Sequence, residues 1–247
     1  TTGEDLNNRD SQAYRAQLLV EASNNLSVLA TFDAQSVDQN PAFGEALSDP
    51  FGAVLLKPKA NNEVNNNHSP TDVRDVWGIS LDIDYTFDND LTLRSISSYR
   101  DTDSDFSFDI DYSPLKLLAA DYKDKYQQTT QEFQLISPAQ DRFDYLIGLY
   151  YYNQKSETQR NAIVGDDITD YMTAILGPLP PEYYPSDQVT NEGTVDTESY
   201  AIFANFNYDI TEQLHLGFGF RYSEETKEVN WNLDGSTSGL FAIGVGQ

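Results

Sequence analysis

The chain has 247 residues, with 40 acidic side chains against 15 Lys and Arg, so its formal net charge is −25. This charge argues against a nucleic-acid partner, because contacts to phosphate depend on Lys and Arg. The absence of cysteine excludes disulfide frameworks, thiolate metal sites and cysteine nucleophiles. Helical membrane spans are excluded as well, since they need about 20 consecutive apolar residues and the sequence has no such stretch.

Alternation of apolar and polar residues predicts eight β-strands, because successive side chains of a strand point to opposite faces of a sheet. In chain order the expected strands cover residues 9–22, 26–38, 72–87, 91–105, 126–137, 143–158, 196–209 and 214–229. The clearest apolar faces contain Trp77, Ile79, Leu81, Ile83, Ile147, Leu149, Leu216, Phe218 and Phe220. In two of the strands, 91–105 and 126–137, polar residues dominate both sides, so their faces are left open.

The opposite faces carry small or polar side chains, namely Ser80, Asp82, His215, Gly217, Gly219 and Arg221. In a membrane β-barrel the apolar face contacts lipid and the other face lines the lumen. On that interpretation the nine apolar residues face lipid, and these six face the lumen or a plug inside it. The two glycines indicate either close approach of another backbone or strand curvature.

The connections alternate strictly between short and long. Short turns are expected at 23–25, 88–90, 138–142 and 210–213, and long loops at 39–71, 106–125 and 159–195. Bacterial outer-membrane barrels have short periplasmic turns and longer extracellular loops. The pattern therefore predicts an all-β, antiparallel up-and-down transmembrane barrel wall in the outer membrane, with outer-membrane lipid as a partner and the long loops outside. The alternative is a soluble or surface-attached β-rich module that binds a glycan or protein through loops at one end.

Residues 199–227 resemble a hairpin of the TonB-dependent receptor family. Hairpins of that family commonly carry Y-A-x-F, a Thr-containing turn and then G-x-R-Y-x-x-E-x-K. The matching residues here are Tyr200, Ala201, Phe203, Thr211, Gly219, Arg221, Tyr222, Glu225 and Lys227. Residues 91–100 and 131–135 are also similar to recurring strands of the family.

The resemblance implies that residues 1–247 form a partial domain, about eight strands of a barrel with about 22 strands. A plug domain and the closing C-terminal strands are then expected outside this segment. Receptors of the family take up a scarce small-molecule nutrient actively across the Gram-negative outer membrane, driven by the TonB energy-coupling complex through the N-terminal part. A ferric siderophore, and hence iron transport, is the first expectation for the substrate, followed by cobalamin or a saccharide. A complete eight-stranded barrel is the structural alternative, and a passive porin is a further one.

No catalytic, metal or cofactor site is expected, and the protein is not expected to be an enzyme; His68 and His215 are the only histidines. Asp101, Asp103 and Asp105 begin like a calcium loop, but an EF-hand needs Gly and Glu where Phe106 and Tyr112 stand. A solvated strand extension is favoured there over a divalent-cation site. Aromatic side chains of loops often carry recognition, so the substrate-contact candidates are Tyr112, Tyr122, Tyr171, Tyr183 and Tyr184.

Overall fold

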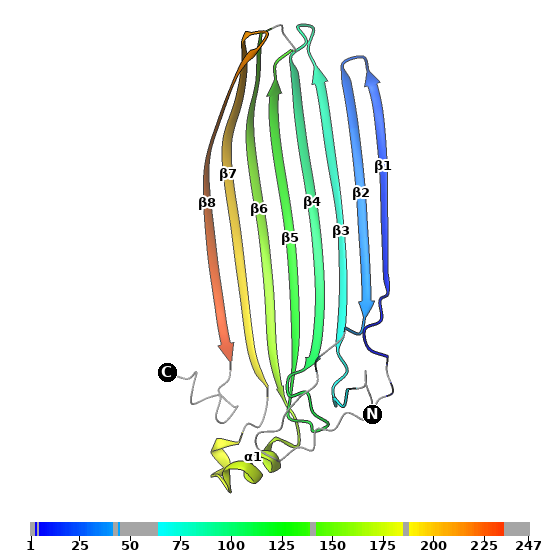
Figure 1. Cartoon of the computed structure of the whole chain (residues 1–247), viewed down its shortest axis with the longest axis vertical. Coiled ribbons are helices and arrows are strands. Elements are labelled where there is room, and N and C mark those ends of the chain that lie inside the picture. Colours follow the sequence, from blue (N-terminus) through cyan, green and yellow to red (C-terminus); the bar gives the residue numbers. More distant parts are fainter. Residues whose placement is uncertain are drawn as a thin grey trace.

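The computed structural model describes residue 3, residues 5–41, residue 44, and residues 64–138, 142–184 and 188–234. In these ranges eight strands form one antiparallel sheet, and each strand pairs with the next one in sequence (Figure 1). The strands are β1 Ser11–Ser23, β2 Leu26–Gln39, β3 Thr71–Thr86, β4 Thr92–Asp109, β5 Leu118–Ile136, β6 Phe143–Val164, β7 Val189–Thr211 and β8 Leu214–Asp234. The predicted all-β up-and-down arrangement is confirmed, as an open sheet in which β1 and β8 do not pair with each other.

All four short connections lie at one end of the sheet, and the long connections lie at the other (Figure 1). Polar side chains close the short turns, as turn chemistry favours. The amide of Asn25 donates to the carbonyl of Thr86 at 2.9 Å, which joins the first turn to the second hairpin. The hydroxyl of Thr211 accepts from the backbone N–H of Leu214 at 3.0 Å. The ends of the strands agree with the predicted alternation of short and long connections, while residues 42–43, 45–63, 139–141 and 185–187 of these connections lie outside the described residues.

The connection between β6 and β7 contains a helix, α1 (Ile168–Leu176), and a short 3-10 turn, η1 (Pro181–Tyr183). No helix in the part of the chain that the structure describes is long and apolar enough to cross a membrane.

The strands extend further toward the long connections than the sequence predicts. β4 continues to Asp109 and β5 begins at Leu118, so the long loop expected over 106–125 shrinks to 110–117. β6 likewise ends at Val164 and β7 begins at Val189. The loop prediction was wrong here because the apolar side of the alternation changes within β4: Phe106 and Phe108 lie on the face opposite to Leu93 and Tyr99, so they do not continue the earlier apolar face.

The register assigns every strand to two faces, because directly paired residues lie on the same face of a sheet. We call a set of directly paired residues a row. One row runs through Val20, Val28, Ile83, Ser95, Phe133, Leu149, Ile202 and Tyr222. We call the face that carries this row the outer face, and the opposite one the inner face. The nine expected apolar residues all lie on the outer face, and Ser80, Asp82, His215, Gly217, Gly219 and Arg221 all lie on the inner face.

The sheet has almost no core of its own. Among the described residues the buried hydrophobic side chains are Val37, Leu117, Ala120 and Ala201. Outer-face side chains such as Leu216 and Phe218 are 57% and 63% exposed. The apolar surface therefore lies on one open face rather than between packed layers.

Candidate functional site

The apolar part of the outer face is a band bounded by aromatic rings. In β3 it runs from Phe87, just past the strand end, to Trp77, and in β8 from Leu214 to Tyr222. On the side toward the long connections its boundary is marked by Trp77, Tyr99, Tyr151, Tyr200 and Tyr222. The row that contains Trp77 reaches β8 at Glu228, six residues beyond Tyr222. The band therefore crosses the strands obliquely.

This offset gives the tilt of the strands against the band. Six residues correspond to roughly 20 Å along a strand, and the five strand spacings from β3 to β8 to roughly 24 Å across the sheet. The ratio gives a tilt of about 40°, inside the roughly 35–45° of outer-membrane barrels. After this tilt, the ten residue-to-residue steps from Phe87 to Trp77 span about 25 Å, which is the height of the apolar band in such barrels.

Beyond the aromatic boundary the outer face becomes charged. Asp103 lies 3.3 Å from Lys125, and Asp105 lies 3.7 Å from Lys123, measured between the charged atoms. Asp101 shares their face, as the sequence predicts. Lysines therefore neutralise two of the three carboxylates, and among the described residues no acidic or histidine group is arranged to hold a metal ion. These ion pairs support the interpretation that this part of β4 is a solvated extension of the strand.

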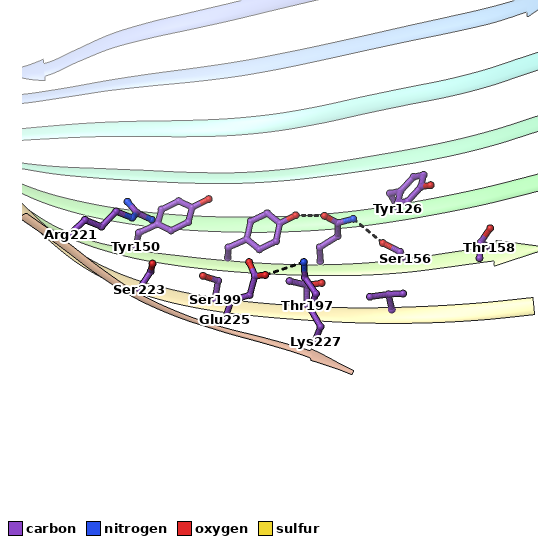
Figure 2. A pocket seen from close by; sticks show the side chains of 13 residues that line it. Tyr126, Tyr150, Ser156, Thr158, Thr197, Ser199, Arg221, Ser223, Glu225 and Lys227 are labelled. Carbon is purple, nitrogen blue, oxygen red and sulfur yellow. Dashed lines mark hydrogen bonds and ion pairs between the residues drawn. The ribbon is translucent and has the colours of Figure 1, made fainter. Parts of the chain in front are cut away.

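The inner face of β5 to β8 is hollowed, with a cavity volume of about 750 Å³ (Figure 2). Tyrosines, hydroxyls and three charged groups line it: Tyr126, Tyr150, Tyr152, Gln154, Ser156, Thr158, Val195, Thr197, Ser199, Arg221, Ser223, Glu225 and Lys227. Along β6, Tyr152 donates to the amide oxygen of Gln154, which in turn donates to Ser156 at 2.8 Å. Lys227 and Glu225 form an ion pair at 3.0 Å. The hollow is thus a polar wall with aromatic faces.

Arg221 is held on this wall by aromatic rings. Gly148, Phe203 and Arg221 form one row, and a side chain at Gly148 would place its Cβ 2.2 Å from the Phe203 ring. The missing side chain therefore lets Phe203 lie flat across β6. The Arg221 guanidinium carbon lies 5.7 Å from the Phe203 ring centre and 5.5 Å from that of Tyr150. Figure 2 shows Arg221 next to Tyr150. Both distances are within the range of a cation–π interaction.

Several other inner-face arginines pair with aspartate. Arg94 makes two hydrogen bonds of 2.7 Å to Asp84, with Asp82 3.5 Å away. Arg100 reaches across β3 to Asp33 at 2.9 Å. It crosses at Gly78, where an added Cβ would lie 3.1 Å from the guanidinium. Such pairs join different strands, and each arginine charge in them is compensated by a carboxylate.

The predicted inner-face residues of β8 contact side chains of β7. A Cβ added at Gly217 would lie 3.3 Å from the Asn207 side chain, and one added at Gly219 would lie 2.8 Å from the Asn205 side chain. Among the described residues, the close neighbours of these glycines are thus amide side chains rather than another backbone. His215 hydrogen-bonds Asp209 in the paired position.

The five tyrosines expected to contact substrate do not gather at one place. Tyr112 lies between β4 and β5, Tyr171 in α1, and Tyr183 in η1. Tyr184 follows η1, where its hydroxyl bonds Thr173 at 2.8 Å and accepts from the Leu179 N–H at 3.0 Å. That hydroxyl therefore stabilises the fold of this connection.

Tyr122 was wrongly expected in a loop. It belongs to β5, on the inner face. The Arg160 guanidinium carbon lies 4.6 Å from the Tyr122 ring centre, while Arg160 pairs with Asp124 at 2.7 Å. The misplacement follows from the polar surroundings of this part of β5, where both faces carry charged or amide side chains.

Two connections are fixed to the strands through Asp109, which is only 1% exposed. Its carboxylate accepts from the backbone N–H of Asn67 at 3.2 Å, of Asp111 at 2.9 Å and of Tyr112 at 2.8 Å. Burial, and then the nearby Asp111 carboxylate, raise the pKa of Asp109, while backbone hydrogen bonds oppose that rise. In the 64–70 segment, His68 also bonds the Ser107 hydroxyl at 2.6 Å.

The 110–117 connection is joined in turn to the one that follows β6. Gly165 donates to the Leu117 carbonyl at 2.8 Å, and the backbone of Lys116 donates to the Asp167 carboxylate at 2.9 Å. A Cβ at Gly165 would lie 2.0 Å from the Lys116 carbonyl oxygen, so only glycine permits this approach. Segments 64–70, 110–117 and 165–167 therefore form one hydrogen-bonded rim.

Sequence reasoning did not single out the hollow. Its tyrosines Tyr150 and Tyr152 lie on the polar side of the alternation in 143–158, opposite to Tyr151. The run of three tyrosines at 150–152 carried the signal, because two of three consecutive residues in a strand must share the face opposite the middle one.

Comparisons with known proteins agree with this geometry. The sequence matches no curated protein. The structure is similar to the crystal structure of the ferric yersiniabactin uptake receptor FyuA from Yersinia pestis, with a TM-score of 0.63 and 14% sequence identity. The similarity covers 91% of this chain and 33% of that receptor, so the chain spans about a third of its length. At this identity the likeness concerns the fold.

The sequence model of one family, described as "TonB dependent receptor-like, beta-barrel", matches residues 13–245. Because this match covers nearly the whole chain and agrees with the strand order, the chain belongs to the TonB-dependent receptor family and corresponds to its β-barrel.

Proposed function

We propose that this chain is part of the membrane wall of an outer-membrane receptor that takes up a scarce nutrient by active transport. The observation that carries the proposal is the oblique apolar band on the outer face. Its height of about 25 Å and its strand tilt of about 40° fit a barrel wall in a bilayer. The inner face behind the band is polar, as the lumen of such a barrel is.

A soluble binding module fits this surface poorly. Soluble proteins rarely expose contiguous apolar patches larger than a few hundred Å². Here Ile79, Leu149 and Phe218 are 52%, 55% and 63% exposed within a single band. In the bilayer, hydrocarbon covers these side chains, and the charged extension beyond the aromatic boundary stands in water.

The full-length receptor then contains more than residues 1–247, since the FyuA chain is about three times as long as the part matched. We assign the plug, the closing strands and the contact with the TonB complex to the rest of the protein. The long connections face the exterior of a Gram-negative cell, where Tyr112, Tyr171, Tyr183 and Tyr184 are candidates for substrate contact. Tyr122 is a candidate from the inner face of β5.

A ferric siderophore is the first candidate for the substrate, with cobalamin and saccharides as alternatives. The similar FyuA is a ferric yersiniabactin uptake receptor, and the aromatic, hydroxyl-lined hollow suits a compact polar ligand with rings. On this proposal the protein is a transporter without catalytic chemistry.

The test has two arms on the full-length protein. In the first, cells are lysed without detergent, and the receptor is expected in the membrane pellet until detergent releases it. In the second, cells take up radiolabelled iron from siderophore-containing medium, cobalamin or oligosaccharide, with and without a protonophore that collapses the energy supply of TonB. We expect accumulation of one substrate that needs both the receptor and the proton-motive force. Receptor in the aqueous fraction, or accumulation that survives the protonophore, contradicts the proposal.

A further inference from the structure

The inner wall carries a positive charge that no carboxylate neutralises. Arg74, Arg94, Arg100 and Arg160 each pair with an aspartate. Among the residues that the structure describes, Arg221 makes no hydrogen bond or ion pair, and its contacts are the two aromatic rings described above. Its N–H donors are therefore available, and the two rings lie beside the guanidinium.

The surroundings of Arg221 have the dimensions and chemistry of a small-molecule site. The hollow of about 750 Å³ lies within the roughly 300–1,000 Å³ of ligand pockets. Lys227 is compensated by Glu225 at 3.0 Å, which leaves Arg221 as the net charge of this lining. Tyrosine side chains and the hydroxyls of Ser199 and Ser223 line the same hollow (Figure 2).

We propose that Arg221 binds an anionic group, a carboxylate or its equivalent, on the ring-bearing small molecule that this receptor carries. A guanidinium presents its donors in a planar fork that matches a carboxylate in two parallel hydrogen bonds. The rings of Phe203 and Tyr150 reduce the freedom that Arg221 loses on binding, because the guanidinium is oriented beforehand. The ring of the ligand stacks on a neighbouring tyrosine of the hollow.

This inference rests on the proposed function for the identity of the ligand, but the binding chemistry is testable without transport. Purified full-length receptor is titrated with 4-fluorobenzoate and with 4-fluorobenzamide, which has the same ring without the charge, and the ¹⁹F relaxation of each probe is followed. Arg221→Gln removes the charge, Arg221→Lys keeps it without the fork, and Arg100→Gln is the matched control because it removes an arginine charge outside the hollow.

We expect saturable binding of 4-fluorobenzoate that Arg221→Gln weakens about tenfold or more, as loss of a charge-assisted contact requires. Arg221→Lys is expected to weaken it less, and Arg100→Gln to leave it unchanged. Affinity for 4-fluorobenzamide should be the same in all four proteins.

Three results would overturn the proposal: no saturable binding to the unaltered receptor, equal weakening of both probes, or unchanged benzoate affinity with a lowered unfolding midpoint in Arg221→Gln. The last result would mean that Arg221 contacts a carboxylate of the protein itself. Failure of the uptake assay with intact benzoate binding would instead reject the proposed function and leave this anion site standing.

Discussion

Substitution of Leu81 by arginine tests the position of the membrane on the outer face. Leu81 lies near the middle of the apolar stretch of β3 that runs from Phe87 to Trp77, and its side chain is 37% exposed. An arginine at the bilayer midplane of a β-barrel costs roughly 2–4 kcal/mol, and one near the interface roughly 0–1 kcal/mol. We therefore expect Leu81→Arg to lower the free energy of unfolding by about 2–4 kcal/mol.

Two control substitutions separate the effect of depth in the membrane from the effects of the sheet face and of the row. Ser80→Arg places the same charge on the inner face, one residue away. Glu224→Arg changes a residue in the same row as Leu81, but one that the tilt carries past Tyr222 and out of the band. Both are expected to cost less than about 1 kcal/mol.

The assay is urea titration of the full-length receptor in lipid vesicles, with the folded fraction read from its mobility on unboiled gels. Equal costs for Leu81→Arg and Ser80→Arg would refute the assignment of the outer face to lipid. A cost for Glu224→Arg as large as that for Leu81→Arg would refute the tilt. It would mean that residues of the same row lie at the same depth in the membrane.

Three further outcomes are expected from the packing and the rim. Gly148→Ala should cost roughly 1–3 kcal/mol and more than Gly78→Ala in the same urea titration, because its Cβ would lie 2.2 Å from the rigid Phe203 ring, whereas the Cβ at Gly78 would meet a flexible guanidinium at 3.1 Å. Burial raises the pKa of Asp109, so the native state binds that proton more tightly than the unfolded state. The stability of the rim should therefore fall as the pH rises through the raised pKa, and limited proteolysis of the rim should become faster. In Asp109→Asn the proteolysis rate should depend less on pH. Gly165→Ala should speed proteolysis of 110–117, since its Cβ would lie 2.0 Å from a carbonyl oxygen of that connection, and an unchanged rate would mean that the two connections are not joined in solution.

The strands were predictable wherever one of their faces is apolar. Residues 76–87 and 214–222 alternate cleanly, and the structure has strands there with the expected sides. The tight turns also fix the hairpin registers, because a short turn leaves little freedom for slippage. The ends facing the long connections were not predictable, because the apolar residues there, such as Phe106 and Phe108, lie on the face opposite to the apolar band.

The sequence predicted which face of the sheet carries Arg221, but not which residues of other strands surround it. Alternation placed Arg221 on the polar side of its strand, yet its neighbour Tyr150 comes from β6, two strands away in the sheet. Their contact depends on Phe203 lying over Gly148, which only the register of three strands reveals. Similarly, the short connection 110–117 is held by the carboxylate of Asp109, whose role depends on a partner more than 40 residues earlier in the chain.

The polar extension of the strands has an electrostatic consequence. β6 continues for thirteen residues beyond Tyr151, to Val164, which at the tilt derived above lifts the rim roughly 30 Å above the aromatic boundary. The Debye length at physiological ionic strength is about 8 Å, so the charge of the anionic leaflet is screened out over less than half of that height. On the proposed orientation of the barrel, a charged molecule arriving at the rim responds to the field of the receptor's own acidic and basic groups, and the lipid composition beneath should leave its rate of capture unchanged.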